Sequence, residues 1–190
     1  MEIPLHEIKD WYQFQHLVAA YFRSLSGERN QYHIADTDVE INGIGPDDGI
    51  DILVTFHYLD AIKKHTLKWI IECKGKEGNG SIGLPDLDTN NILALLKAKK
   101  ADGYLLVCKG NASNKLKTRF RELSTADEGK FSFEIWEGFV LWHKISERES
   151  LLRTFFPDYY NKNYIENRAK ERFDALVNEF QAQLEKKDVK

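Results

Sequence analysis

The chain has 190 residues, of which 42% are hydrophobic and 12% aromatic, and its formal net charge at pH 7 is −3. The length fits one domain, and the apolar fraction is too high for a disordered chain. No segment reaches the ~20 apolar residues of a membrane-spanning helix, and the N-terminus lacks the pattern of a secretory signal. We therefore expect a soluble, cytoplasmic protein without a membrane partner.

The N-terminal half predicts one helix followed by three strands. Apolar residues at helical spacing predict an amphipathic helix over residues 10–25. Residues 32–41 alternate loosely and predict a strand, and turn-forming residues follow it. The runs 50–59 and 66–73 are rich in β-branched and aromatic residues and are joined by a short polar link. This pattern favours an antiparallel hairpin.

The pattern then changes to alternating helices and strands. After a glycine-rich loop, we expect a helix at 86–100, whose first residues are acidic and whose last are basic. The next predicted elements are a strand at 103–108, a basic helix at 111–123, a strand at 131–136 and a short helix at 138–145. This order predicts an α/β fold with a central mixed β-sheet flanked by helices.

The C-terminal residues predict a connector followed by a long amphipathic helix. Residues 155–163 have the composition of a connector. The helix beyond them carries one apolar stripe, which must be buried on the body, on a second copy or on another domain. We therefore divide the chain into a domain at 1–157 and a linker or oligomerisation helix at 158–190. The stripe consists of Ile165, Ala169, Phe173, Leu176, Val177, Phe180 and Leu184.

One acidic residue and one lysine have a spacing that suggests chemistry. Residues two apart on a strand share a face, so Glu72 and Lys74 should point to one side while Cys73 faces the core. Four other tripeptides in the chain have the same acid-any-lysine pattern, but they lie in polar surroundings. Only Glu72 follows a strand-like run, and only it has an aspartate, Asp51, placed to meet it across a hairpin.

Two carboxylates close together repel each other unless a cation lies between them. Mg²⁺ is held by one or two protein carboxylates, waters and phosphate oxygens, and a lysine beside it can assist water attack on phosphorus. Asp51, Glu72 and Lys74 therefore predict metal-assisted phosphodiester hydrolysis, with the backbone carbonyl of Cys73 as a further ligand. The alternative is an exposed surface pair, which would contribute roughly 0.2 to 1 kcal/mol.

The segments GPDDGIDILV and WIIECKGK, together with the first helix and the elements up to Ile145, resemble the PD-(D/E)xK nucleases, specifically the Mrr-type restriction endonuclease catalytic domain. The resemblance implies a restriction-endonuclease-like fold in which Asp51 and Glu72 bind Mg²⁺ or Mn²⁺ and Lys74 is catalytic. It also implies endonucleolytic cleavage of double-stranded DNA that leaves a 5′-phosphate, and an effector role in a prokaryotic restriction or anti-phage system, often fused to or associated with a sensor module.

The chain departs from the family pattern at several positions. Gln15 stands where the first helix usually offers a glutamate, and Asn90 or Asn91 stands where a glutamine is common. Asp47 falls near a position that is often acidic, and Asp48 replaces a common glycine. A catalytically inactive binding module and an RNA- or junction-directed nuclease therefore remain as alternatives. The accessory candidates are Gln15, Asp47, Asp48, Lys76 and Asn91.

The segment between residues 97 and 121 has an excess of basic side chains and a single acid, Asp102. Such an excess can face phosphates, although a solvated helix face has the same composition. Nothing in the sequence resembles a base-reading module. The nucleic-acid-binding candidates are Lys97, Lys100, Lys115, Lys117, Arg119 and Arg121.

Overall fold

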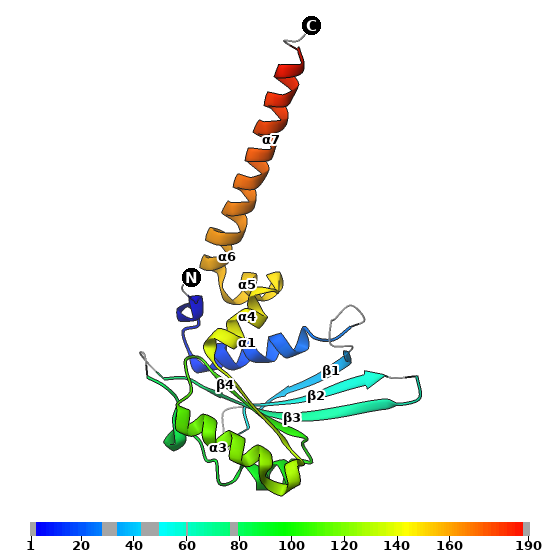
Figure 1. Cartoon of the computed structure of the whole chain (residues 1–190), viewed down its shortest axis with the longest axis vertical. Coiled ribbons are helices and arrows are strands. Elements are labelled where there is room, and N and C mark those ends of the chain that lie inside the picture. The colour runs from blue at the N-terminus through cyan, green and yellow to red at the C-terminus, as the bar shows by residue number, and fades with distance from the viewer. Residues whose placement is uncertain (1–2, 28–33, 43–49, 60, 77–79, 188–190) are drawn as a thin grey trace.

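The computed structural model describes residues 3–27, 34–42, 50–59, 61–76 and 80–187 (Figure 1). Strands β1 to β3 follow the first helix, and helices alternate with strands thereafter. The elements are η1 (Pro4–Glu7), α1 (Trp11–Arg23), β1 (Ile34–Ile41), β2 (Ile52–Leu59), β3 (Lys64–Lys74), η2 (Leu84–Asp86), α2 (Ile92–Lys99), β4 (Gly103–Cys108), α3 (Asn114–Thr125), η3 (Ala126–Gly129), β5 (Ser132–Trp136), α4 (Gly138–Ser146), α5 (Glu149–Phe155), α6 (Pro157–Tyr160), the π-helical turn η4 (Asn161–Ile165) and α7 (Glu166–Lys187).

The five strands form one sheet in the order β1-β2-β3-β4-β5. Antiparallel pairing joins β1 to β2 and β2 to β3, whereas β4 lies parallel to both β3 and β5. The predicted hairpin and the predicted mixed sheet are therefore confirmed. Because β3, β4 and β5 are parallel, their carboxyl ends lie side by side at one end of the sheet. The residues discussed below lie at that end.

Alternation along the strands divides the core between the two faces of the sheet. Ile71, Cys73 and Leu105 belong to a cluster that α1, α4 and α5 cover. Ile70 and Leu106 point to the opposite face, into a second cluster that α2 and α3 cover. In Figure 1, α1 and α3 lie on opposite sides of the strands, which makes the three-layer arrangement visible. The fold is thus held by two apolar cores that share the sheet.

Side-chain caps fix the beginnings of two helices. Asp10 accepts a hydrogen bond from the Gln13 backbone N–H, at 2.7 Å, and starts α1. Ser113 accepts one from the Leu116 backbone N–H and starts α3. Each cap satisfies a backbone donor that a helix leaves without an intrahelical partner.

The prediction of a helix beginning at residue 86 is wrong, because α2 begins only at Ile92. The acidic side chains before it form turns instead. Asp86 accepts from the Gly83 backbone N–H at 2.7 Å and pairs with Lys76, while Asp88 accepts from the Asn90 backbone N–H at 3.3 Å. Short polar side chains that hydrogen-bond to nearby backbone compete with helix formation, which explains the later start.

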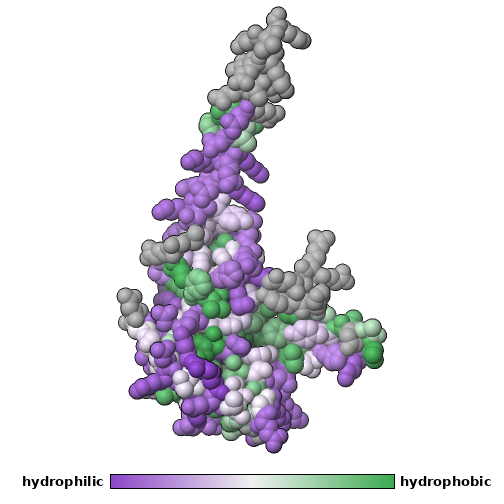
Figure 2. Space-filling view, in the orientation of Figure 1, coloured by the Kyte–Doolittle hydropathy of each residue, from purple (hydrophilic) through white to green (hydrophobic). Residues whose placement is uncertain are grey.

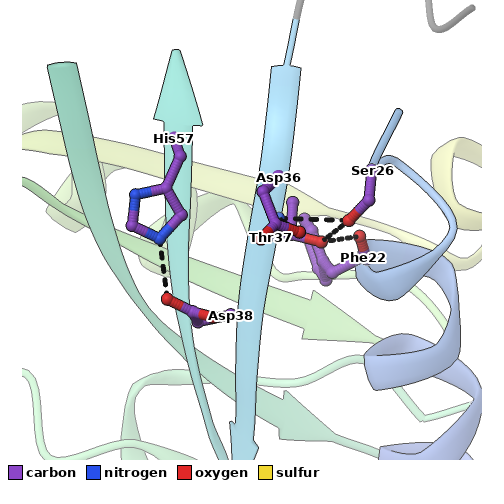
Figure 3. A network of polar contacts seen from close by, with 6 residues as sticks. All are labelled: Phe22, Ser26, Asp36, Thr37, Asp38 and His57. Atoms are coloured by element: carbon purple, nitrogen blue, oxygen red, sulfur yellow. Dashed lines mark hydrogen bonds and ion pairs between the residues drawn. The ribbon is translucent and has the colours of Figure 1, made fainter. Parts of the chain in front are cut away.

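A polar network joins the end of α1 to the outer strands (Figure 3). Thr37 Oγ1 donates to the Phe22 carbonyl at 3.2 Å, and the Ser26 and Thr37 hydroxyls lie 2.5 Å apart. On the neighbouring strand, His57 Nε2 lies 2.7 Å from Asp38 Oδ2. The Thr37 contacts hold the end of α1 against β1, and the His57 contact joins β2 to β1.

The predicted connector at 155–163 is wrong, because α5, α6 and η4 are helical there and lead directly into α7. Phe156 and Tyr160 explain the difference, since both are buried in the α1 face of the core. Beyond them α7 projects away from the body (Figure 1), and apolar patches interrupt its hydrophilic surface (Figure 2). Phe173, Leu176 and Phe180 are 64 to 66% exposed, so the body does not cover this stripe. No described helix is both long and apolar enough to span a membrane.

Candidate active site

Strand β3 places Glu72 and Lys74 on one face, as predicted. Lys74 Nζ lies 2.6 Å from Glu72 Oε1. The intervening Cys73 is fully buried on the other face, and burial raises the pKa of its thiol well above the usual range. Cys73 is therefore a core residue, and the pair beside it lies at the carboxyl end of β3.

Asp51 reaches the same place from the start of β2. Ile52 pairs with Ile71 in the hairpin, which sets Asp51 opposite the end of β3. Asp51 Oδ2 accepts a hydrogen bond from the Cys73 backbone N–H, and Oδ1 accepts one from Gln15 Nε2, both at 2.6 Å. The carboxylate of Asp51 is thus fixed to the peptide between Glu72 and Lys74, and α1 contributes the side chain that holds its second oxygen.

Glu72 is a buried carboxylate, with only 7% of the residue exposed. Burial raises its pKa, and the charge of Asp51 acts in the same direction. Hydrogen bonds from Lys74 and from the Tyr104 hydroxyl favour the ionised form but do not outweigh burial. A carboxyl group in this position is poorly solvated, so a cation at the site would stabilise it strongly.

Tyr104 is the residue of this cluster that the sequence did not suggest. It lies on β4 opposite Ile70, two residues before the Leu106 that pairs with Glu72, and its hydroxyl donates to Glu72 Oε2. Burial and the neighbouring Glu72 raise the pKa of Tyr104 well above the usual range, so it remains a donor. The alternation of GYLLVC places Tyr104 on the face of Glu72, but only once β3 and β4 are known to be parallel neighbours.

The donor set fits Mg²⁺ by its chemistry. Among the described residues, no three His, Cys, Asp or Glu side chains form a group that could hold a metal ion. Asp51 and Glu72 nevertheless provide two carboxylates, and Mg²⁺ is commonly bound through one or two carboxylates with waters and phosphate oxygens completing its shell. Such a set would be poor for zinc, which takes nitrogen and sulfur ligands in closed sites.

The remaining accessory candidates have separate surroundings. Lys76 forms an ion pair of 2.7 Å with Asp86, and the bonds from Lys76 and from the Gly83 backbone lower the pKa of that aspartate. Asn91 is exposed at the start of α2 and makes no side-chain cap there. Asp47 and Asp48 lie outside the described residues. Of the accessory candidates described, only Gln15 bonds directly to one of the three central residues.

The basic candidates are spread over α2 and α3. Lys97, Lys100 and Lys115 are exposed. Two others are engaged in ion pairs, Lys117 with Glu137 at 2.8 Å and Arg119 with Glu122 at 3.2 Å. Arg121 is exposed one turn further along α3. Their role toward nucleic acid stays a prediction.

The sequence matches a family model described as restriction endonuclease, the Mrr catalytic domain, over residues 7–125. The chain belongs to this family. The matched range contains Gln15, Asp51, Glu72, Lys74 and Tyr104, so the cluster lies entirely inside the family domain. The mixed sheet with flanking helices is accordingly the restriction-endonuclease-like fold of the PD-(D/E)xK nucleases, and the expected resemblance is confirmed.

Solved structures with a similar arrangement include two restriction endonucleases. The chain covers 38% of the DNA modification-dependent endonuclease AspBHI (77% of this chain, 9% identity, TM-score 0.43). It covers 27% of MspJI, solved with a 27-mer oligonucleotide (70% of this chain, 10% identity, TM-score 0.45). A third similar structure is a protein of unknown function, AF1548 (16% identity, 72% of this chain, 66% of that one, TM-score 0.46). No curated protein gives a significant match.

Proposed function

We propose that this protein is a Mg²⁺-dependent endodeoxyribonuclease that hydrolyses phosphodiester bonds in DNA. The observation that carries the proposal is the convergence of Asp51, Glu72 and Lys74. Asp51 accepts a hydrogen bond from the backbone N–H of Cys73, the residue between Glu72 and its ion-pair partner Lys74. Membership in the restriction endonuclease family supports the same conclusion from the sequence.

In this proposal Asp51 and Glu72 hold the metal, and the Cys73 carbonyl is a further ligand. When bound, Mg²⁺ would polarise the phosphate and lower the pKa of a coordinated water. Asp51 and Glu72 are suited to this role because hydrogen bonds from Gln15, the Cys73 backbone and Tyr104 fix the orientation of both carboxylates. Groups that orient ligands in this way raise metal affinity.

Lys74 is proposed as the catalytic residue. Its ammonium is partly exposed and close to Glu72, so it can turn from that carboxylate to a substrate phosphate without leaving the site. There it would orient the attacking water and stabilise the negative charge that develops on the phosphoryl oxygens. The bond between the water oxygen and phosphorus forms while the bond from phosphorus to the 3′-oxygen breaks, which leaves a 5′-phosphate and a 3′-hydroxyl.

The test is cleavage by the purified full chain with Mg²⁺, with Mn²⁺ and with EDTA. The substrates are supercoiled plasmid, linear duplex, a four-way junction and RNA, and the products are labelled at either end to locate the phosphate. We expect cleavage of DNA with either metal and none in EDTA. Cleavage that persists in EDTA, or a product with a 3′-phosphate, would overturn the proposal.

Asp51→Asn provides the matched variant, with Asp38→Asn as its control. Asp38 is an exposed aspartate that pairs with His57 on the outer strands, away from the carboxyl ends of the parallel strands. We expect Asp51→Asn to abolish both cleavage and the rise in melting temperature that Mn²⁺ produces, because a ligand that binds only the folded state stabilises it. Asp38→Asn should retain both. Equal behaviour of the two variants would remove Asp51 from the site.

A second candidate is a module of the same fold that binds nucleic acid without cutting it. It is favoured by one observation: each carboxylate oxygen of Asp51 and Glu72 already contacts a protein donor. If these contacts excluded a cation, DNA would bind without hydrolysis. Retained DNA binding together with no Mn²⁺-dependent stabilisation would select this candidate.

We further propose that α7 is an association element of an effector nuclease in a restriction or anti-phage system. The exposed side chains of Phe173, Leu176 and Phe180 support this, since a solvated apolar stripe gains free energy when another surface covers it. Light scattering of the full chain should give more than one copy per particle, and Phe173→Glu with Leu176→Glu should give a monomer. A monomeric wild-type chain would leave association to a different protein.

A further inference from the structure

A groove of about 790 Å³ lies directly beside the proposed active site. It begins at Gly75, the residue after Lys74, and runs between the start of α1 and the segment that follows β4. Its volume is in the range of roughly 300 to 1,000 Å³ that is typical of ligand pockets. The residues that carry the following argument are Lys9, Asp10, Trp11, Gly75 and Lys109, all of which line it.

Trp11 presents an aromatic surface inside this groove. It is 40% exposed, although α1 has a fully buried side available for large apolar residues. Trp11 and Gln15 are four residues apart on α1 and therefore share a helix face, one turn from each other. Gln15 bonds to Asp51, so Trp11 lies one turn of α1 before the residue that holds a proposed metal ligand. Its ring edge is also near the backbone at Gly75, with Trp11 Cζ3 3.6 Å from where a Cβ would stand.

The groove also holds positive charge. Lys109 Nζ donates to the neutral Ile8 carbonyl at 2.6 Å and forms no ion pair with any acid in the described part of the chain. The Lys109 backbone N–H donates to the Lys74 carbonyl at 2.8 Å, so Lys109 is fixed to the strand that carries the proposed catalytic lysine. Lys9 forms no ion pair with the described residues either. Asp10, the acid among the described lining residues, caps α1 and keeps its negative charge, so Lys9 and Lys109 leave an excess of positive charge in the groove.

We propose that this groove binds an unpaired nucleotide of the substrate strand, with its base stacked on Trp11 and its phosphates beside Lys9 and Lys109. The inference rests on the proposed nuclease function and names its preferred substrate class, which is DNA with an unpaired or extruded base next to the cleaved bond. Cationic grooves with exposed aromatic rings are the usual design for single-stranded nucleic acid. In an intact duplex the base faces are covered by their neighbours, so only an unpaired base can cover Trp11.

Binding measurements test the groove separately from catalysis. All proteins carry Lys74→Ala and are assayed in EDTA, so that no probe is cut. The fluorescein-labelled probes are a single strand of about 20 nucleotides, longer than typical single-strand sites, the matched duplex, and the same duplex with a central mismatched bubble. Trp11→Leu keeps an apolar side chain without a ring, Trp11→Phe keeps a ring, and Tyr12→Leu removes an exposed ring outside the groove from the same helix.

We expect Trp11→Leu to weaken binding of the single strand and the bubble by about 5- to 150-fold, the factor that corresponds to ~1 to 3 kcal/mol of stacking. Duplex binding should change by less than about twofold. Trp11→Phe should recover part of the loss, and Tyr12→Leu should bind every probe like the parent. As a second measurement, 2-aminopurine in the single strand should lose fluorescence on binding the parent and keep it with Trp11→Leu.

Several outcomes would overturn the inference. These are an equal loss on duplex and single strand, a loss on unpaired probes smaller than about twofold, or a parent protein that binds none of the three probes. A chain that cleaves DNA with Mg²⁺ but shows no dependence on Trp11 would keep the proposed function and lose the groove. A chain that discriminates through Trp11 but never cleaves would keep the groove and lose the proposed function.

Discussion

Two lysine–glutamate pairs lie near the carboxyl ends of the parallel strands, and they differ in how deeply the glutamate is buried. Lys74 pairs with Glu72 at the end of β3, at 2.6 Å, and Lys117 of α3 pairs with Glu137 just after β5, at 2.8 Å. The lysine side chains are similarly exposed, at 32% and 35%. The glutamate side chains are not, since that of Glu72 is 9% exposed and that of Glu137 is 26% exposed.

This difference in burial reverses the electrostatics of the two carboxylates. Burial raises the pKa of Glu72 despite its two hydrogen bonds, and Asp51 adds to the effect. At Glu137 burial also acts to raise the pKa, but the bonds from Lys117 and from the Ala112 backbone N–H outweigh it, and the pKa falls. Glu137 is ionised because the fold favours its charge, whereas the fold keeps Glu72 where its charge is costly. A carboxyl group whose charged form is disfavoured by burial, as at Glu72, is typical of functional sites.

The largest expected contrast is in cleavage. We predict that Lys74→Ala reduces the rate of DNA cleavage by about 10²- to 10³-fold, the usual loss when one group that stabilises transition-state charge is removed. Lys117→Ala removes an ammonium of similar exposure from a similar pair. With protein in saturating excess over DNA, it should change the rate of the chemical step by less than about twofold, whether or not Lys117 contacts DNA. Single-turnover cleavage with Mg²⁺ measures both. If the two variants lost activity equally, the pairs would not differ in function.

The next contrast concerns the tyrosine hydroxyl that bonds to the second oxygen of Glu72. Glu72 Oε2 accepts from the buried hydroxyl of Tyr104, and we predict that Tyr104→Phe weakens Mn²⁺ binding by about 10- to 100-fold, as removal of groups that orient metal ligands usually does. The matched control is Tyr58→Phe, which deletes a partly buried hydroxyl on β2. Thermal-shift titration with Mn²⁺ gives both affinities without any need for cleavage. Unchanged affinity in Tyr104→Phe would show that this phenol does not orient Glu72 for metal.

These contrasts also separate what the sequence could predict from what it could not. Strand period is local, so the common face of Glu72 and Lys74 and the burial of Cys73 followed from the residues themselves. The hairpin was equally readable, and it brought Asp51 to the same point. The contact of Asp51 with Gln15 needed the docking of α1, and that of Glu72 with Tyr104 needed the parallel neighbour and its register. Both depend on residues more than 30 positions apart.

Two elements were predicted wrongly, for different reasons. A helix start at residue 86 was expected from acids in sequence, but Asp86 is used by Lys76 and the Gly83 backbone. The segment 155–163 was predicted to be a connector, although Phe156 and Tyr160 bury their rings in the core and keep it helical. The ion pair of Lys117 with Glu137, twenty positions away, was not predicted either, and the role of Lys117 toward nucleic acid stays a prediction. The helical segment before α7 and the Lys117 pair depend on partners distant in sequence, whereas the late start of α2 reflects a local choice between turn and helix that composition alone does not settle.

A smaller contrast is expected in stability. Glu137→Gln weakens a partly exposed ion pair and should lower the free energy of unfolding by roughly 0.2 to 1 kcal/mol. Glu72→Gln should leave it unchanged or raise it, because the amide avoids the burial of a charge and Lys74 is exposed enough to remain solvated. Urea unfolding in EDTA at neutral pH measures both variants against the wild type. A loss at Glu72→Gln larger than that at Glu137→Gln would mean that burial does not dominate at Glu72.

The finest distinction is in the pH dependence of these two stability differences. The folded-state pKa of Glu137 is lowered, so its favourable contribution is present above the ordinary carboxyl pKa of about 4.3 and is lost as the pH falls through the folded value. The folded-state pKa of Glu72 is raised, so the folded protein binds its proton more tightly. The stability that Glu72 gains by binding this proton is present below about pH 4.3 and is lost as the pH rises through the folded-state pKa.

In EDTA, the stability advantage of wild type over Glu137→Gln should therefore shrink on acidification. The stability of wild type relative to Glu72→Gln should instead decline as the pH rises above about 4.3. Slopes of the same sign in the two series would contradict the contrast between the pairs, because opposite shifts of two carboxyl groups require opposite linkage to protons.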